Sequence, residues 1–469
     1  MRDYEESAPW IGGAQARANK QKKVLIISRA FPPESGSAVY RPLKFTKFLP
    51  SYGWKPYVVT PKKNINPLDY SLIRDIPGGV SVNEVFSLDP SNLKAILWKK
   101  YKHGNIGKVT YSFLKALLKV YSIIYYRVVI VDWHDGWVPF GFIKAKQVES
   151  KEDMDLIYVD MEPPSSSIIG LLLKRTTGKP LVIDYHDPWT TSVYAKESKG
   201  FKGRIAGYLE HKILNLADKV TAGKDIVISE IMEKFSDVDR RKFMTINSGY
   251  DTDDFMGLEK RKESRFVITY TGKLSEKFYY SPESFLYALG ELIKEKKIPE
   301  DDVTVIFVGS VSSRYQSRFQ SLVKDLNLEN IVVSTGSVDH RKCAEYQINS
   351  DVLLYIIESL EGKEVSYEFS GALPSKLYEY IYTGNPIMAI VPQGVEADII
   401  KRTRTGFIAE PNDVNSVKGL LYELYERYKK GALRIDPDQE EVSKYDRKIL
   451  TGKLAHVFDG ILGPRDKEG

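Results

Sequence analysis

Cysteine is almost absent from this sequence: Cys343 is the single one among 469 residues. The chain therefore forms no intramolecular disulfide and no cysteine-based zinc cluster, which fits a reducing compartment. Long apolar runs are also missing, and the first ten residues, MRDYEESAPW, lack an apolar core. Because no 18 consecutive residues are apolar, we expect no transmembrane helix, and we expect no signal peptide either.

Two further shortages narrow the class of protein. No Gly-x-Gly-x-x-Gly follows a strand pattern, which disfavours a dinucleotide-dependent dehydrogenase. The excess of positive charge is small: the formal net charge is +6, which for this length does not by itself indicate a nucleic-acid partner. The composition, 42% hydrophobic and 28% charged, is typical of a globular protein, and the length predicts two or three domains.

Short apolar runs alternate with amphipathic helix candidates along most of the chain. The run at residues 24–27 is typical of a strand buried on both faces, and RPLKFTKFLPSYGW after it is typical of a helix. This alternation predicts an α/β protein of two doubly wound, Rossmann-like domains facing each other across a cleft. The predicted parts are a disordered tail (1–21), a first domain (22–252), a charged linker (253–265), a second domain (266–430) and a C-terminal helix that crosses back to the first domain (431–469).

The segment LPSKLYEYIYTGNPI, residues 373–387, predicts a short helix whose start could bind an anion. Pro374 has no N–H to lose at a helix start, Ser375 can cap it, and the free amides there attract negative charge. Lys376 adds a cation, and Glu379 lies about 4.5 Å further along the axis. The pattern fits a nucleoside diphosphate lying across the helix start, with its ribose on Glu379. It fits equally an ordinary capped helix with a surface Lys–Glu pair.

Five stretches along residues 22–430 carry a family resemblance. They are KKVLIISRAFPPESGSAVYR, VIDYHDPW, INSGYDTDDF, YTGKLSEK and LPSKLYEYIYTGNPIMAIVPQG with the downstream TRTGFIAEPND. Their kind and order resemble the retaining glycosyltransferases of family 4, which have the two-domain GT-B fold. The resemblance implies that a sugar is transferred from a nucleoside-diphosphate donor to an acceptor, with retention at the anomeric carbon.

The resemblance also implies roles for individual positions. Gly36 and Ser37 match the small-residue loop whose backbone approaches the donor phosphate or the acceptor, although a plain turn fits them as well. Lys273 and Lys277 match the basic pair that neutralises the diphosphate leaving group. Glu379 matches the ribose ligand.

The sequence departs from the family pattern at two places. Gly371 stands where many members carry a glutamate that contacts the donor sugar. In GKLSEK a lysine stands where arginine is common, which keeps the charge but loses the bidentate fork. Both departures leave the identity of the donor open.

Polar residues follow two strands of the first domain. In IDYHDPWT, His186 and Asp187 come after a buried strand, where the resemblance implies contacts to the donor sugar or the acceptor hydroxyl. Asp187 as a cap and His186 as a packed side chain fit the motif equally. Glu162, in EPPSSS, could reach the acceptor or be an exposed helix-start glutamate. Asp251–Thr252–Asp253 resembles the metal-binding Asp-x-Asp of another glycosyltransferase fold, but no ligand cluster accompanies it, so we expect no metal.

Residues 91–131 form a basic, aromatic stretch without an acidic residue. Its eight cationic side chains are Lys94, Lys99, Lys100, Lys102, Lys108, Lys115, Lys119 and Arg127. From Lys108 the pattern predicts an amphipathic helix, with one face made of Lys108, Ser112, Lys115, Lys119 and Ser122 and the other of Leu114, Leu117, Leu118, Tyr121, Ile124 and Tyr125. Such a helix suits an anionic membrane surface, and it equally fits packing on the first sheet with solvated lysines.

The leading hypothesis is a retaining, metal-independent glycosyltransferase without cofactor, cytoplasmic and peripheral on the inner face of the cell membrane. Its partners would be a nucleotide sugar and a glycan or lipid-linked acceptor in the synthesis of cell-surface polysaccharide or glycoconjugate, and no nucleic acid. A nucleotide-sugar epimerase of the same fold and a catalytically silent nucleotide-binding protein stay open as alternatives. The assigned residues are, for catalysis, His186, Asp187, Lys273 and Lys277; for the donor, Gly36, Ser37, Gly272, Pro374, Ser375, Lys376, Leu377 and Glu379; and for the acceptor, Arg41 and Glu162.

Overall fold

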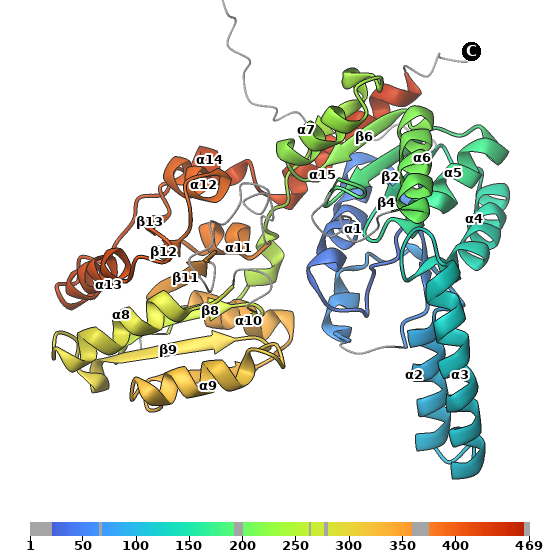
Figure 1. Ribbon diagram of the computed structural model, residues 1–469. Helices are drawn as coiled ribbons and strands as arrows, with labels where there is room; N and C mark the ends of the chain where they lie inside the picture. Colours follow the sequence, from blue (N-terminus) through green and yellow to red (C-terminus); the bar gives the residue numbers. More distant parts are fainter. Residues whose placement is uncertain are drawn as a thin grey trace, which may run out of the picture.

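The computed structural model describes residues 21–64, 68–191, 200–261, 264–275, 280–358 and 375–463. These residues form two parallel β-sheets with helices on both faces of each, side by side in Figure 1. The predicted α/β class with two Rossmann-like sheets is confirmed. Most of the expected N-terminal tail, together with Lys277, Gly371 and Pro374, lies outside the described residues.

The first sheet has seven parallel strands in the order β3-β2-β1-β4-β5-β6-β7. Its strands are β1 (Lys22–Ile27), β2 (Trp54–Pro61), β3 (Ser81–Val85), β4 (Leu156–Asp160), β5 (Leu181–Tyr185), β6 (Lys219–Ala222) and β7 (Phe243–Thr245). The helices among them are α1 (Ser37–Phe48), α2 (Pro90–Lys102), α3 (Lys108–Val128), α4 (Val138–Glu152), α5 (Ser165–Thr177), α6 (Phe201–Leu216) and α7 (Asp225–Lys234).

The second sheet has six parallel strands in the order β10-β9-β8-β11-β12-β13. Its strands are β8 (Phe266–Thr271), β9 (Val303–Val308), β10 (Val332–Gly336), β11 (Val352–Ile356), β12 (Ile387–Ile390) and β13 (Gly406–Ala409). The helices that follow its first strand are α8 (Glu283–Lys294), α9 (Gln316–Asp325), α10 (His340–Ile348), α11 (Ser375–Thr383), α12 (Val395–Thr403), α13 (Val414–Lys429), α14 (Gln439–Ser443) and α15 (Arg447–Leu462).

The apolar runs of the sequence become strands that are buried on both faces. Every residue of β4, β5, β8, β11 and β12 is buried, as expected of parallel strands covered by helices on either side. The order of the strands reverses between β1 and β4 and again between β8 and β11. In such sheets ligands bind outside the carboxyl ends of the strands at the point of reversal, so two candidate edges result.

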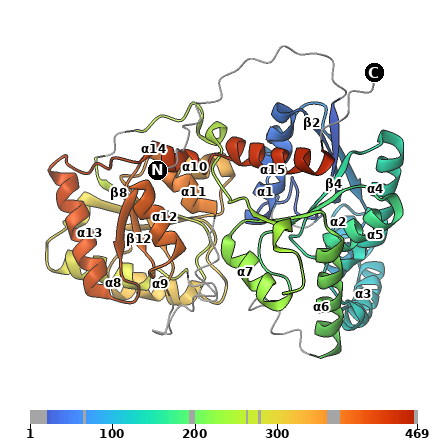
Figure 2. The ribbon, with the colours of Figure 1, turned by 90° about the horizontal axis from the view of Figure 1, so that it is seen from above.

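The C-terminal helix returns to the first sheet. Leu450, Leu454 and Phe458 of α15 join the core cluster that contains Val24 of β1, and Figure 2 shows α15 lying along α1. The first residue of α15, Arg447, therefore sits where the two sheets meet.

One pair of helices does not cover a sheet. The hairpin made of α2 and α3 projects from the first sheet, with α3 packed along α2 (Figure 1). The helix start expected at Lys108 is where α3 begins. Among the described residues, no helix combines the length and apolar character that crossing a bilayer requires.

A buried lysine holds the segment that leads out of the first sheet. The ammonium of Lys44 in α1 donates to Asp75, Asp251 and Asp254 at 2.6–2.9 Å. Burial alone would lower the pKa of Lys44, but the carboxylates, Asp254 first, hold that pKa above its usual range. The Asp251 carboxylate also accepts a hydrogen bond from Lys47 at 2.6 Å. Lysines of α1 thus occupy this acidic group.

Replacing Lys44 by methionine should lower the free energy of unfolding by about 3–5 kcal/mol, because three buried carboxylates then lose the cation they share. Urea denaturation followed by tryptophan fluorescence measures the change. The matched control is Lys179→Met, since Lys179 pairs with the largely exposed Asp153 and should cost less than about 1 kcal/mol. Equal effects of the two substitutions would contradict this account of Lys44.

Candidate functional site

A cavity of about 910 Å³ lies between the two sheets, at the carboxyl ends of their strands. The segments after β1, β2, β4, β5, β6 and β7 form one wall, and those after β8, β9, β10 and β11 form the other. Of the site residues predicted from the sequence, those that line it are Gly36, Ser37, Arg41, Glu162, His186, Asp187, Gly272, Lys273, Ser375, Lys376 and Glu379. Leu377 is fully buried in the core and does not line the cavity.

A second cavity, of about 680 Å³, lies elsewhere on the second domain. Asp351 and Asn385, which line it, precede β11 and β12. It therefore lies at the amino ends of the strands, away from the edge at which ligands of such sheets bind. The cavity between the sheets is the candidate functional site.

Two glycines bring the backbone close to the open space of the cavity. Gly36, which precedes α1, has a φ of 131° and no atom within 4 Å of the place where a Cβ would lie. Gly272, after β8, has a φ of 125°. Both conformations favour glycine, so each wall presents one stretch of backbone that a ligand can approach closely.

Lys376 is a buried cation among aromatic rings. Its ammonium lies 3.9 Å from the ring centre of Tyr270, 4.8 Å from that of Tyr280 and 5.5 Å from that of Tyr355. Within the described part of the chain, no carboxylate lies at ion-pair distance from it. Burial therefore lowers its pKa to about 7. The aromatic faces stabilise the cation only in part, so an anion in the cavity would find an uncompensated charge.

Glu379 lies one turn deeper on α11, and two side chains of α10 already hold it. One carboxylate oxygen lies 3.2 Å from Nε2 of His340, and the other accepts a hydrogen bond from Gln347 at 2.7 Å. Burial raises the pKa of the carboxyl, but the contact with His340 outweighs this, and the pKa lies below its usual range. Glu379 is therefore ionised and fixed in orientation, with lone pairs left for ligand hydroxyls.

His340 also joins the two domains. Its ring packs against Tyr40 of α1, with ring centres 4.8 Å apart, and its backbone N–H donates to Asp69 at 3.2 Å. Its Nδ1 lies 3.9 Å from a carboxylate oxygen of Asp254. His340, which positions Glu379, is thus itself contacted by three residues that precede the second sheet.

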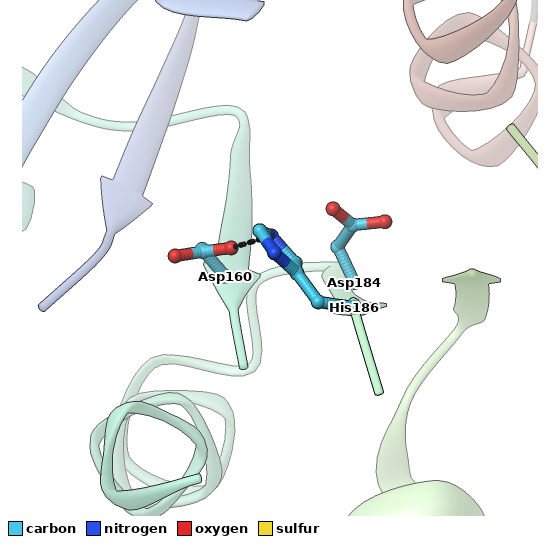
Figure 3. A group of neighbouring side chains, drawn as sticks. All are labelled: Asp160, Asp184 and His186. Atoms are coloured by element: carbon cyan, nitrogen blue, oxygen red, sulfur yellow. Dashed lines mark ion pairs between the residues drawn. The ribbon is translucent and has the colours of Figure 1, made fainter. Parts of the chain in front are cut away.

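His186 is held by a carboxylate at the end of the neighbouring strand. Figure 3 shows its ring directed toward Asp160, and Nε2 lies 2.6 Å from Oδ1 of that residue. Burial would lower the pKa of His186, but the negative charge of Asp160 raises it above its usual value. The other oxygen of Asp160 accepts a hydrogen bond from Ser28 at 2.8 Å. His186 thus presents an imidazole that Asp160 orients, with a raised pKa, at the wall of the cavity.

Arg41 is used inside the first domain. It forms a two-pronged ion pair with Asp184 of β5, at 2.6 and 2.8 Å, and its remaining terminal nitrogen donates to the carbonyls of Ile246 and Asn247. Because all three guanidinium nitrogens are engaged, this arrangement fits a structural role better than the expected contact with an acceptor.

Asp160, Asp184 and His186 lie close enough together to suggest a metal site (Figure 3). Both oxygens of Asp184 are already occupied, however. Asp184 accepts from Arg41 and, in addition, from Tyr158 at 2.6 Å and Thr221 at 2.5 Å. The donor set therefore does not fit a divalent cation without rearrangement.

Glu162 and Asp187 flank His186 at the cavity. Burial, strengthened by Asp187 and Asp160 and opposed by His186, raises the pKa of Glu162 to about 7. Asp187 is half exposed, and Lys224 lies 3.2 Å from it. Near neutral pH the Glu162 carboxyl can therefore either accept or donate a proton.

Arg447 brings a further cation to the cavity from the C-terminal helix. Its side chain is buried, and Nε donates to the carbonyl of Gly249 at 2.8 Å. Burial, with repulsion from Arg41, lowers the pKa of its guanidinium to about 10. Among the described residues, no carboxylate lies within ion-pair distance of it. Arg447 is not among the residues predicted from the sequence, because its position in the tail carries no local signal.

The side chains that bind the predicted residues Glu379 and His186 were not predicted from the sequence either. Asp160 and Gln347 lie 26 and 32 positions from the side chains they hold, and His340 lies 39 positions from Glu379. Asp160 could have been found, because it ends the buried run DLIYVD next to the strand that carries His186. Nothing in the sequence of α10 marks its two polar residues as neighbours of Glu379.

Two family models match the chain. Glycosyltransferase Family 4 matches residues 111–254, and Glycosyl transferases group 1 matches residues 252–447. No curated protein matches the chain by sequence.

Solved structures share the fold over nearly the whole chain. Sucrose-phosphate synthase from Thermosynechococcus elongatus has a TM-score of 0.59 and 14% identity, with 93% of this chain and 98% of that chain covered. Anabaena HepE in complex with UDP-glucose has 0.57 and 15%, with 93% and 98% covered. A mutant of S. aureus TarM in complex with UDP, alpha-GlcNAc-glycerol and Fondaparinux has 0.55 and 10%, with 93% and 100% covered.

Replacing Lys376 by methionine should stabilise the ligand-free protein, because it removes a buried cation that has no anionic partner among the described residues. Folding lowers the pKa from 10.5 to about 7, so the cost of the charge is full below pH 7 and fades as the pH rises toward the unfolded value. We expect a gain of about 2–4 kcal/mol at pH 6 and a much smaller one at pH 10. Thermal unfolding at both pH values measures it. The exposed Lys273→Met is the control, and an equal gain at both pH values would contradict the assignment.

Proposed function

Because this chain belongs to the family 4, group 1 glycosyltransferases, we propose that it transfers a sugar from a nucleoside-diphosphate sugar to a glycan or lipid-linked acceptor. We further propose retention of the anomeric configuration and a place in the synthesis of cell-surface polysaccharide or glycoconjugate. The observation that carries the proposal is the start of α11, where the uncompensated Lys376 and the fixed Glu379 face one cavity. His186 faces the same cavity from the first sheet.

The donor diphosphate would lie at the start of α11. Ser375 and Lys376 offer the helix amides and a cation, and the backbone at Gly272 allows close approach from β8. A diphosphate would restore the proton that burial drives from Lys376. Because negative charge grows on the diphosphate as the sugar departs, a fixed cation there stabilises the transition state more than the ground state.

The nucleoside would be held by Glu379. His340 and Gln347 keep its carboxylate ionised and oriented before the ligand arrives. Two ribose hydroxyls can then donate to the free lone pairs of that carboxylate. Charge-assisted hydrogen bonds of this kind are stronger than neutral ones, so the ribose fixes where along α11 the diphosphate lies.

The acceptor would enter from the first sheet. His186, with Asp160 behind it, can donate a hydrogen bond to a sugar or acceptor hydroxyl, and Glu162 and Asp187 can accept one. In the proposed retaining reaction the departing phosphate oxygen takes the acceptor proton, so the wall of the first sheet positions the hydroxyl. We propose no metal ion, because the cations Lys376 and Arg447 line the cavity and the carboxylates of Asp75 and Asp184 already pair with Lys44 and Arg41.

We place the protein in the cytoplasm, peripheral on the inner face of the cell membrane. The support is the excess of cations at residues 91–131, since anionic lipid attracts basic segments next to a bilayer.

Replacing Glu379 by alanine should weaken the binding of UDP about 10- to 100-fold, because a charged acceptor of ribose hydrogen bonds is lost. Isothermal titration calorimetry with UDP measures the dissociation constant. The control Glu345→Ala removes a partly exposed carboxylate of α10 that pairs with Lys342 and should leave the constant unchanged. An unaltered constant for Glu379→Ala would remove the ribose assignment.

Replacing His186 by alanine should lower the rate of sugar transfer about 100-fold while the dissociation constant for UDP stays the same. The imidazole lies on the wall of the first sheet, away from the start of α11, and the loss of a group that positions a reacting hydroxyl typically costs this much. Single-turnover kinetics and UDP titration separate the two effects. If UDP binding falls as far as the rate, His186 belongs to the donor site.

The class of reaction is tested with labelled UDP-, GDP-, ADP- and dTDP-sugars. Label that moves to an added glycan or lipid-linked acceptor supports a transferase, and the anomeric configuration of the product reports retention. A changed sugar without any acceptor would indicate an epimerase, and nucleotide binding without turnover would indicate a silent protein.

A further inference from the structure

The hairpin of α2 and α3 carries an apolar surface that no part of the described chain covers. Where the helices meet, the rings of Tyr101 and Tyr111 stack with their centres 4.4 Å apart. At the base, Tyr125 donates to Asp89 at 2.9 Å and Tyr121 to the carbonyl of Leu88 at 2.9 Å. The hairpin is therefore anchored to the first domain while its outer side faces away from it (Figure 1).

The structure divides the apolar residues of α3 between two faces. Those toward α2 are half-buried or buried, among them Leu114, Leu118 and Tyr125. Leu117 and Ile124, which the sequence placed with them on one face, are 51% and 57% exposed. The expected two-faced helix is therefore corrected: one apolar face packs on α2, and a second is open. This second face, here called the apolar stripe, consists of Val109, Phe113, Leu117, Val120, Ile124 and Val128.

The apolar stripe is continuous and long. Its members recur at intervals of three and four residues over the length of α3, so at 3.6 residues per turn they lie on one side of the helix. Exposure reaches 84% at Val109, 63% at Phe113 and 65% at Val128. Single exposed apolar residues are common, but a contiguous row of this length marks an interaction surface.

Cations line another exposed side of α3. At 100° per residue, Lys108, Lys115 and Lys119 fall on a narrow strip next to the face that packs on α2, about 150° around the helix from the centre of the apolar stripe. None of the eight cationic side chains of residues 91–131 has a carboxylate at ion-pair distance in the described part of the chain. The exposed Trp98 and Trp133 lie on and near the same hairpin, and tryptophan suits a boundary between water and hydrocarbon.

We propose that the apolar stripe of α3 inserts into the interfacial layer of an anionic lipid bilayer, with the lysines of the hairpin on the lipid headgroups. A second copy of this chain is a poorer occupant, because symmetric pairing through the stripe would bring like-charged helices together. An anionic bilayer accommodates both features at once, since its hydrocarbon takes the apolar side chains and its headgroups attract the cations.

The base of the hairpin leads to the acceptor wall of the cavity. The carboxylate of Asp132, directly after the basic stretch, accepts a hydrogen bond from the backbone N–H of Ser165 at 2.5 Å. Ser165 begins α5, three residues after Glu162, which lines the cavity. If the proposed sugar transfer holds, this connection favours the lipid-linked class of acceptor. The docking itself does not rest on the proposed sugar transfer.

The test is flotation of the full chain with vesicles of phosphatidylcholine and phosphatidylglycerol in a two-to-one ratio. We expect the parent to float with these vesicles and to remain behind with phosphatidylcholine alone. The double substitution Phe113→Glu and Leu117→Glu should lower the floated fraction about tenfold or more, because two charges then replace inserted apolar groups. Lys115→Glu with Lys119→Glu should lower it by a similar factor through lost attraction to the headgroups.

The matched control is Tyr287→Glu, an exposed aromatic position on α8 of the second domain, which should float like the parent. All substituted positions are exposed, and circular dichroism with UDP titration checks that each variant is folded. A parent that never floats with anionic vesicles overturns the proposal, as does a double variant that floats unchanged. A parent dimer that the double variant converts to monomer, with flotation unchanged, would assign the stripe to a second copy.

Sugar transfer measured on the same samples separates the two proposals. Flotation without any sugar transfer would support the docking surface and contradict the proposed transferase activity. Sugar transfer in solution without flotation would support the transferase activity and contradict the docking surface.

Discussion

Two buried cations on one helix, Arg41 and Lys44 of α1, set the position of the cavity. Arg41 ties α1 to Asp184 at the end of β5, and Lys44 ties it to Asp251 and Asp254 in the segment that leads toward the second sheet. Burying these charges is tolerable only because each has carboxylates at hydrogen-bond distance. Since α1 begins at the wall of the cavity, the same two contacts fix that wall and the point where the chain leaves the first sheet.

Lys376 and Arg447 are also buried, but unlike Arg41 and Lys44 they have no carboxylate at ion-pair distance among the described residues. Both line the cavity, and both have lowered pKa values because burial outweighs the attraction of any carboxylate in the described part of the chain. A protein tolerates such charges when a ligand supplies the missing anion, and it gives up stability without the ligand. The paired cations of α1 hold the first domain and its exit segment together, whereas these two are the cations that a phosphate-bearing ligand would meet.

The two domains act on one site because residues of each reach into the other. His340 contacts Glu379 within the second domain and Tyr40 and Asp69 in the first, while α15 carries Arg447 back to the junction. The hairpin of α2 and α3 is likewise connected to the cavity. Its base contacts the start of α5, beside Glu162, so the proposed lipid-binding surface and a wall of the cavity are joined by direct contact within the first domain.

The sequence by itself determined the strands, the two-sheet architecture and the opening of α11. A strand that is buried on both faces has a continuous apolar sequence, which can be recognised directly. The start of α11 can also be recognised, because its amides, lysine and glutamate come from residues within one turn of each other. Only the tertiary structure decided that Arg41 is engaged by Asp184, that His340 and Gln347 hold Glu379, that Arg447 joins the cavity and that α3 has two apolar faces. Ion pairs between residues far apart in the chain leave no periodic signal, and a helix pattern records that a side chain is apolar without recording whether a neighbour covers it. For those features the fold must first bring the partners together.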